Sequence, residues 1–121
     1  MTVRRVLCCS TQPNFKDNLP KGLPDDFRKR WELHDIDDPI FRTITITRDD
    51  GFKSNIDWEK EKEEGVVMAV LCDDPYEYVL STFFREVLFT AQLPVYWYSR
   101  FNGRPSIIEI KAFGKGSLIG S

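Results

Sequence analysis

The feature that most constrains the fold is a pair of alternating runs on either side of an Asp-Gly dipeptide. Polar and apolar side chains alternate over residues 43–47 and again over residues 52–58, and Asp50-Gly51 lies between the two runs. Alternation with a period of two is typical of a half-buried β-strand, and Asp-Gly is favoured in the tight primed turn of a β-hairpin. This stretch therefore predicts an antiparallel hairpin.

Three further observations predict strands. Residues 2–9 are rich in Val and Leu, and residues 65–72, GVVMAVLC, form a continuous apolar run of strand length. Such a run, bounded by Gly and by acids, indicates a central strand. Asn102-Gly103 lies between residues 95–101 and 105–113, and it predicts a second hairpin.

The acid pair Asp73-Asp74 marks the start of a long helix. Asp74 stands at the cap position, Pro75 at the first helical position and Glu77 at the third, which is a capping-box pattern. We expect this helix to run to about Ala91, and its largely apolar surface indicates that it packs on more than one side or lies across a sheet. Asp73 is not needed for the cap, and a single carboxylate is weak evidence for a magnesium ligand.

Two other segments complete the predicted organisation. Residues 25–35, DDFRKRWELHD, predict a short helix with Asp25 or Asp26 as its cap, after an irregular arm over residues 10–26 that contains three prolines. Residues 114–121 predict a flexible tail. We therefore expect a single α+β domain over residues 1–121. Its sheet would be mainly antiparallel, with about six strands, two hairpins and one long helix packed on a face.

Composition excludes several classes of protein. No apolar run approaches the roughly 20 residues that a membrane helix needs, and the apolar stretch near the start is too short for a signal peptide. We therefore expect a cytoplasmic protein that does not bind membranes. Three cysteines, one histidine and no C-x-x-C pair make a zinc site untenable, so we predict reduced thiols, no metal and no cofactor.

The charge of the chain is concentrated in its middle third. Residues 31–64 carry five Lys or Arg and eleven Asp or Glu, a net charge of −6, whereas the whole chain has a net charge of −2. A nucleic-acid-binding domain is typically basic, so this distribution favours a basic protein partner instead. The predicted acidic surface consists of Asp35, Asp37, Asp38, Asp49, Asp50 and Asp57.

The second hairpin is the other predicted binding surface. Tyr96, Tyr98, Arg100 and Arg104 alternate or lie close together along it. Tyr and Arg are typical anchors of protein interfaces, and this interpretation is favoured. The alternative is that the rings stack on single-stranded nucleic acid beside the two cations.

Catalytic motifs are not recognisable in the sequence. His34 next to Asp35 suggests a general base, but no serine or cysteine completes a nucleophilic set. Cys8 would need a nearby helix start or cations to become a reactive thiol. We therefore assign no catalytic residue, although His34, Cys8, Cys72 and Asp73 remain the candidates for an unusual site.

These observations favour a small non-catalytic protein-binding domain. Its most concrete form is an inhibitor or immunity-type protein that neutralises a basic toxin or nuclease through an acidic surface. The alternatives are a small enzyme with an unrecognised site, and a nucleic-acid-binding module that uses the aromatic and basic hairpin. Two copies of the chain could also pair through exposed strand edges, so a homodimer is a further possibility.

Overall fold

A single six-stranded sheet organises the molecule. The computed structural model describes residues 3–47, 53–73, 82–99, 103–113 and 117–120, with the backbone alone for 112–113 and 117–120. The strand order is β2-β1-β3-β4-β5-β6. The strands are β1 (Arg5–Ser10), β2 (Ile40–Thr45), β3 (Val66–Leu71), β4 (Val95–Ser99), β5 (Ser106–Phe113) and β6 (Ser117–Gly120).

The sheet is mixed, and its first four strands in spatial order are parallel. β1 pairs in parallel with both β2 and β3, and β3 pairs in parallel with β4. Only the β4–β5 and β5–β6 pairs are antiparallel. The chain combines helices and strands as expected, but the prediction of a mainly antiparallel sheet is wrong.

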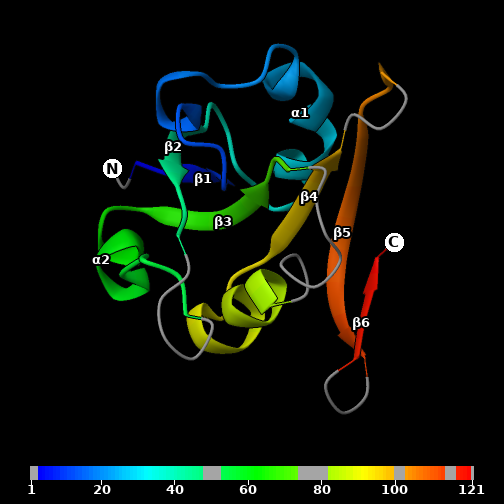
Figure 1. Ribbon diagram of the computed structural model, residues 1–121. Coiled ribbons are helices and arrows are strands. Elements are labelled where there is room, and N and C mark those ends of the chain that lie inside the picture. The colour runs from blue at the N-terminus through cyan, green and yellow to red at the C-terminus, as the bar shows by residue number, and fades with distance from the viewer. Residues whose placement is uncertain (1–2, 48–52, 74–81, 100–102, 114–116, 121) are drawn as a thin grey trace.

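Short helices cover both faces of the sheet (Figure 1). They are α1 (Leu23–Leu33), α2 (Trp58–Glu63) and a helix over residues 82–91 that ends in the π-helical segment η3 (Glu86–Ala91). The 3-10 turn η1 (Phe15–Asp17) precedes α1. α1 packs on one face, and α2 and the 82–91 helix pack on the other. The prediction of one long helix on a single face is therefore wrong: none of the described helices exceeds the 11 residues of α1.

Burial on both faces explains the continuous apolar run of β3. Successive side chains of a strand point to opposite faces, so a strand between two helical layers needs apolar residues at every position. Met68 and Val70 of β3 lie in the core beneath α1, together with Phe27 and Trp31. Ala69 and Leu71 lie in the core on the other face, beneath the helices α2 and 82–91. The prediction that this run is a central strand is confirmed.

The path of the chain across the sheet reverses once. From β1 the chain moves outward through α1 to β2, and from β2 it returns through α2 to β3 on the far side of β1. Parallel crossovers keep one handedness, so the covering helix must change face when the direction changes. This requirement explains why α1 and α2 lie on opposite faces, and it places the point of reversal between β1 and β3.

The first predicted hairpin does not form. β2 pairs in parallel with β1, and the described residues 53–57 contain only an isolated bridge at Ser54. Asp57 accepts a hydrogen bond from the backbone N–H of Lys60, at 3.3 Å, and thereby caps α2 at Trp58. The acidic and basic residues after Trp58 are thus helical as far as Glu63. Asp50-Gly51 lies outside the described residues.

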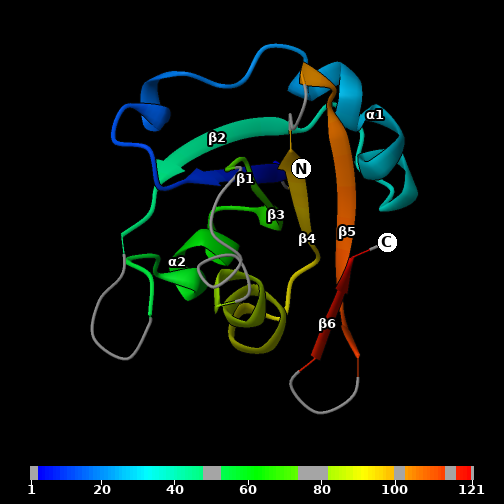
Figure 2. The same ribbon diagram turned by 45° about the vertical axis from the view of Figure 1, so that its right-hand side comes forward.

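The second predicted hairpin is confirmed. β4 and β5 pair antiparallel, Ser99 lies opposite Ser106, and Gly103 in the connection has a φ of 73°. β5 continues beyond the start of β4 and pairs there with β6, so the two strands form a ribbon that extends past β4 (Figure 2). β6 belongs to the segment that was expected to be a tail.

Helix ends were predicted less well than strands. Gly22, with a φ of 87°, caps α1, whereas Asp25 and Asp26 lie in its first turn and do not cap it. Asp74 and Pro75 of the predicted capping box lie outside the described residues. The 82–91 helix ends at Ala91, as expected. Within the part of the chain that the structure describes, no helix is long and apolar enough to span a membrane.

Candidate functional site

The loop over residues 34–39, between α1 and β2, holds a group of exposed acids. Ile36 is buried in this loop, and its N–H donates to the carbonyl of Trp31 at 3.0 Å. The Arg4 guanidinium donates to the backbone carbonyl of Asp35 at 2.8 Å. The loop is therefore tied both to α1 and to the segment before β1. It presents the exposed side chains of Asp35, Asp37 and Asp38.

A hollow of about 520 Å³ lies beside this loop. Its lining consists of Arg28, Trp31, Glu32, Ile36, Asp37, Asp38 and Pro39. Three residues with carboxylates and one with a guanidinium thus line the hollow. The guanidinium is 3.5 Å from Asp25 in an exposed ion pair. The hollow has the charge, the size and the aromatic side chain that would suit a Lys or Arg side chain of a partner.

Exposed apolar side chains flank the same loop. Leu33 at the end of α1 is 72% exposed, Ile40 at the start of β2 is 48% exposed, and Val3 is 45% exposed. The N–H of Ile40 donates to the carbonyl of Arg4, which places the start of β2 beside Val3. We call this region, at the amino ends of β1 and β2, the amino-end surface; it comprises Val3, Leu33, Asp35, Asp37, Asp38, Ile40 and the hollow.

The predicted acidic residues are only partly brought together. Asp35, Asp37 and Asp38 share the amino-end surface. Asp57 is exposed at the start of α2, on the other face of the sheet, where it serves as a helix cap. Asp49 and Asp50 lie outside the described residues. The sequence showed the charge of the segment, but it could not show which acids share a surface.

The aromatic hairpin residues are divided between core and surface. Tyr96 and Tyr98 are buried beneath α1, and the Tyr98 hydroxyl donates to Asp26 at 2.6 Å. A module that stacks bases on these two rings would have to expose them first. Arg104 is exposed, and Arg100 lies outside the described residues.

His34 forms part of a polar chain between α1 and the sheet. Its Nε2 is 2.5 Å from the hydroxyl of Tyr96, which donates to Glu109 at 3.3 Å. The Arg30 guanidinium lies 5.9 Å from the centre of the Tyr96 ring. Burial, and then the charge of Glu109, raise the pKa of Tyr96 to about 12. This series of polar contacts links α1 to β4 and β5, so His34 has a structural role.

A second polar cluster lies at the carboxyl ends of the parallel strands. The carboxylate of Asp73 accepts hydrogen bonds from the hydroxyl of Ser10, from the N–H of Thr11 at 2.8 Å and from the hydroxyl of Thr11 at 2.9 Å. The backbone carbonyl of Asp73 accepts from Trp97 Nε1 at 2.6 Å. Sequence analysis considered Asp73 but missed Ser10, Thr11 and Trp97. These residues come close to Asp73 only because β1 and β4 pair in parallel with β3, and no local sequence pattern indicates that pairing.

Cys9 and Cys72 are thiols in an environment that disfavours the thiolate. Cys8 and Cys9 are buried. Burial raises the pKa of Cys9 well above its usual value, and a hydrogen bond with Cys8, followed by burial, does the same for Cys72. These thiols are therefore poor nucleophiles at neutral pH. Among the described residues, no group of three His, Cys, Asp or Glu side chains could hold a metal ion.

Comparison with known proteins identifies no relative of this chain. No protein-family model matches the sequence, no curated protein matches it, and no solved structure matches its fold. The functional proposals below rest on geometry, burial and charge.

Proposed function

We propose that this chain is a non-catalytic binding protein whose amino-end surface recognises a basic protein. The observation that carries the proposal is the hollow, whose lining includes Trp31 and three acids, Glu32, Asp37 and Asp38. An inhibitor or immunity-type protein that neutralises a basic toxin or nuclease is its most concrete form. The surface acids would attract such a partner, and the hollow would receive one of its basic side chains.

The apolar residues of the amino-end surface would contribute binding affinity that charge alone does not provide. Exposed ion pairs contribute little to affinity, whereas apolar side chains at the centre of an interface contribute much of it. Leu33 and Ile40 are exposed next to the acids and would be covered by the partner. The loop is already held by Arg4 and by the buried Ile36, so little conformational entropy would be lost when it binds.

The test begins with affinity capture from a native cell extract at low salt. A captured basic protein is then purified and its Kd is measured by calorimetry against variants of this chain. Asp37→Lys should weaken binding by about tenfold or more, because it reverses a charge at the hollow. Glu63→Lys is the matched control: it makes the same charge change at an exposed position of α2, on the other face of the sheet.

A second readout locates the contact directly. The chain has three tryptophans, so three indole N–H signals are expected in a nitrogen–proton NMR spectrum. The basic partner should shift the signal of Trp31, which lines the hollow. Equal effects of the two Lys variants, or the absence of any basic protein in the captured material, would contradict the proposal.

A further inference from the structure

The reversal of the chain between β1 and β3 gives the sheet a second candidate binding site. After β1 the chain departs towards α1 on one face, and after β3 it departs towards the 82–91 helix on the other. In open parallel sheets, the divergence of these two connections leaves a crevice at the carboxyl ends of the strands, where ligands bind. This rule gives only the location of a crevice in the fold. Whether a ligand binds there, and of which kind, depends on the side chains that line it.

Buried polar side chains gather at this edge. Five polar or charged side chains of the described residues are buried: Ser10, Ser54, Glu61, Asp73 and Ser99. Ser10 ends β1, Asp73 lies two residues after the last residue of β3, and Ser99 ends β4. Three of the five therefore lie at the carboxyl ends of three neighbouring parallel strands. Burying polar groups is costly, and apolar residues would serve the core better there.

The Asp73 cluster keeps some hydrogen-bonding capacity. A carboxylate offers about four acceptor positions, and Ser10 and Thr11 occupy three of them. The hydroxyl oxygen of Thr11, which is half-buried, can also accept while its proton is donated to Asp73. Asp73, which is 5% exposed, and the half-buried Thr11 therefore keep two neighbouring acceptor positions for a hydrogen-bond donor.

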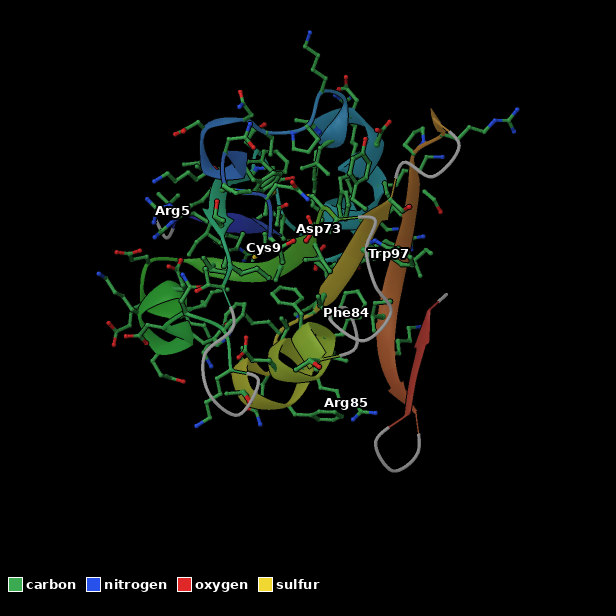
Figure 3. The ribbon with its side chains drawn as sticks, in the orientation of Figure 1. Arg5, Cys9, Asp73, Phe84, Arg85 and Trp97 are labelled. Carbon is green, nitrogen blue, oxygen red and sulfur yellow. The ribbon has the colours of Figure 1, made fainter. Side chains whose placement is uncertain are left out.

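An aromatic ring lies next to these acceptors. Trp97 is half-buried, and its Nε1 donates to the backbone carbonyl of Asp73, so the indole is held beside the cluster (Figure 3). A planar ring can stack on such an indole, and base–aromatic stacking is worth about 1–3 kcal/mol per base in other proteins.

The charge of the described residues argues against an anionic ligand at this edge. Ser10, Thr11, Gln12, Asp73 and Trp97 include one carboxylate and no cation. Phosphate sites in parallel sheets use a helix that begins immediately after the first strand. Here α1 begins only at Leu23, after the η1 turn, and its first turn carries Asp25 and Asp26.

We propose that the carboxyl edge of β1, β3 and β4 binds a neutral ligand with a vicinal diol, such as an unphosphorylated nucleoside. The two hydroxyls donate to the Asp73 carboxylate and to the Thr11 hydroxyl oxygen, and the planar base lies against Trp97. This site is separate from the amino-end surface, which lies at the opposite ends of β1 and β2, and it does not depend on the proposed protein partner.

The test titrates the intact chain with adenosine, 2′-deoxyadenosine, AMP and D-ribose, each up to about 10 mM, with NMR detection. Adenosine should shift the indole signal of Trp97 saturably and leave those of Trp31 and Trp58 unchanged. 2′-Deoxyadenosine lacks the diol and AMP adds a negative charge near Asp73, so both should bind about tenfold more weakly or worse. D-Ribose, which has no base to stack, should bind more weakly than adenosine.

Variants separate the two halves of the proposed site. Thr11→Val removes one acceptor but keeps the N–H that bonds Asp73, and it should weaken adenosine binding by about fivefold to tenfold. Thr90→Val makes the same change at an exposed position of the 82–91 helix, and it should have no effect. Trp97→Leu should remove the preference for adenosine over D-ribose.

Three outcomes would overturn the proposal, and each can be read from the wild-type protein. The first is no saturable shift with adenosine or D-ribose. The second is equal affinity for adenosine and 2′-deoxyadenosine, which would exclude recognition of the diol. The third is a shift of Trp31 in place of Trp97, which would place the ligand in the hollow.

Discussion

Asp73 and Glu61 are both buried carboxylates, but their surroundings differ. The oxygens of Asp73 accept three hydrogen bonds, which connect residues that lie 62 or 63 positions apart in the sequence. Glu61 is 5% exposed; its Oε1 is 3.0 Å from an Arg42 nitrogen, and its Oε2 is buried with no hydrogen-bond partner among the described residues. A buried oxygen without a partner is costly, so the two acids should affect stability in opposite directions.

Glu61 makes stability depend on pH. Burial raises its pKa, and the Arg42 guanidinium opposes that increase only in part. A carboxyl group with a higher pKa in the folded state stabilises the fold below its unfolded pKa, and this contribution is lost as pH rises through the folded pKa. We therefore expect Glu61→Gln to be as stable as the wild type or more stable at about pH 7, by on the order of 1 kcal/mol.

Urea unfolding between about pH 4 and pH 7 measures this effect, and the variant should lose less stability across that range than the wild type. Glu63→Gln, at an exposed position of the same helix, is the control and should follow the wild-type curve. Arg42 is also 2.5 Å from Glu64, so it would retain one carboxylate partner in the variant. A large loss of stability at neutral pH would mean that the Arg42 pair outweighs the burial of Glu61.

At the scale of elements, α2 shows how a cap can override an alternating pattern. Residues 52–58 alternate as a strand would, and Ile56 and Trp58 are indeed buried. The Asp57 side chain nevertheless accepts the N–H of Lys60 and starts a helix at Trp58. Short helices depend strongly on such ends because nucleation is unfavourable.

Replacement of Asp57 tests this explanation. Asp57→Ala leaves an N–H of the first turn without its side-chain acceptor, and we expect the free energy of unfolding to fall by about 1 kcal/mol. Asp57→Ser keeps a capping oxygen and should recover most of the loss. Chemical denaturation of both variants measures the difference. Equal stability of the Ala and Ser variants would show that the cap does not hold α2.

At the scale of the whole molecule, Tyr96 joins the layers. Its hydroxyl contacts His34 at the end of α1 and Glu109 on β5, and its ring packs edge-on against Phe27 at 5.3 Å. These contacts keep the phenol neutral, since burial and the Glu109 charge raise its pKa to about 12.

This pKa shift predicts a loss of stability in alkali. The unfolded chain releases the Tyr96 proton near pH 10 and the folded chain only near pH 12, so stability should fall as pH rises through that interval. Tyr96→Phe has no such proton, and its stability should decline less steeply from about pH 9 to pH 11 in urea unfolding. Because the variant also loses a hydrogen bond, the comparison concerns the slopes and not the absolute values. Parallel slopes would contradict the prediction.

Several elements were predictable because their signals are local. The apolar run of β3, the Asn102-Gly103 hairpin and the helical residues before Ala91 depend on neighbours in sequence, and the structure has them where the sequence indicated. Of the candidate sites, Asp35, Asp37, Asp38 and Asp73 were recognisable in the sequence. It could not predict the hollow around Trp31 or the bonds from Ser10 and Thr11, because these require α1, β1 and β3 to be placed in space.

The sequence by itself thus determined where most strands and helices lie and which residues are apolar. Only the tertiary structure decided that β2 pairs with β1 in parallel, that α1 and α2 cover opposite faces, and that Asp73 meets Thr11. The physical reason is that parallel pairing is non-local. An alternating pattern indicates which side chains of a strand are buried, but it does not indicate which strand pairs with that strand. The pairing is determined by the need to bury both faces of β1 and β3 at once.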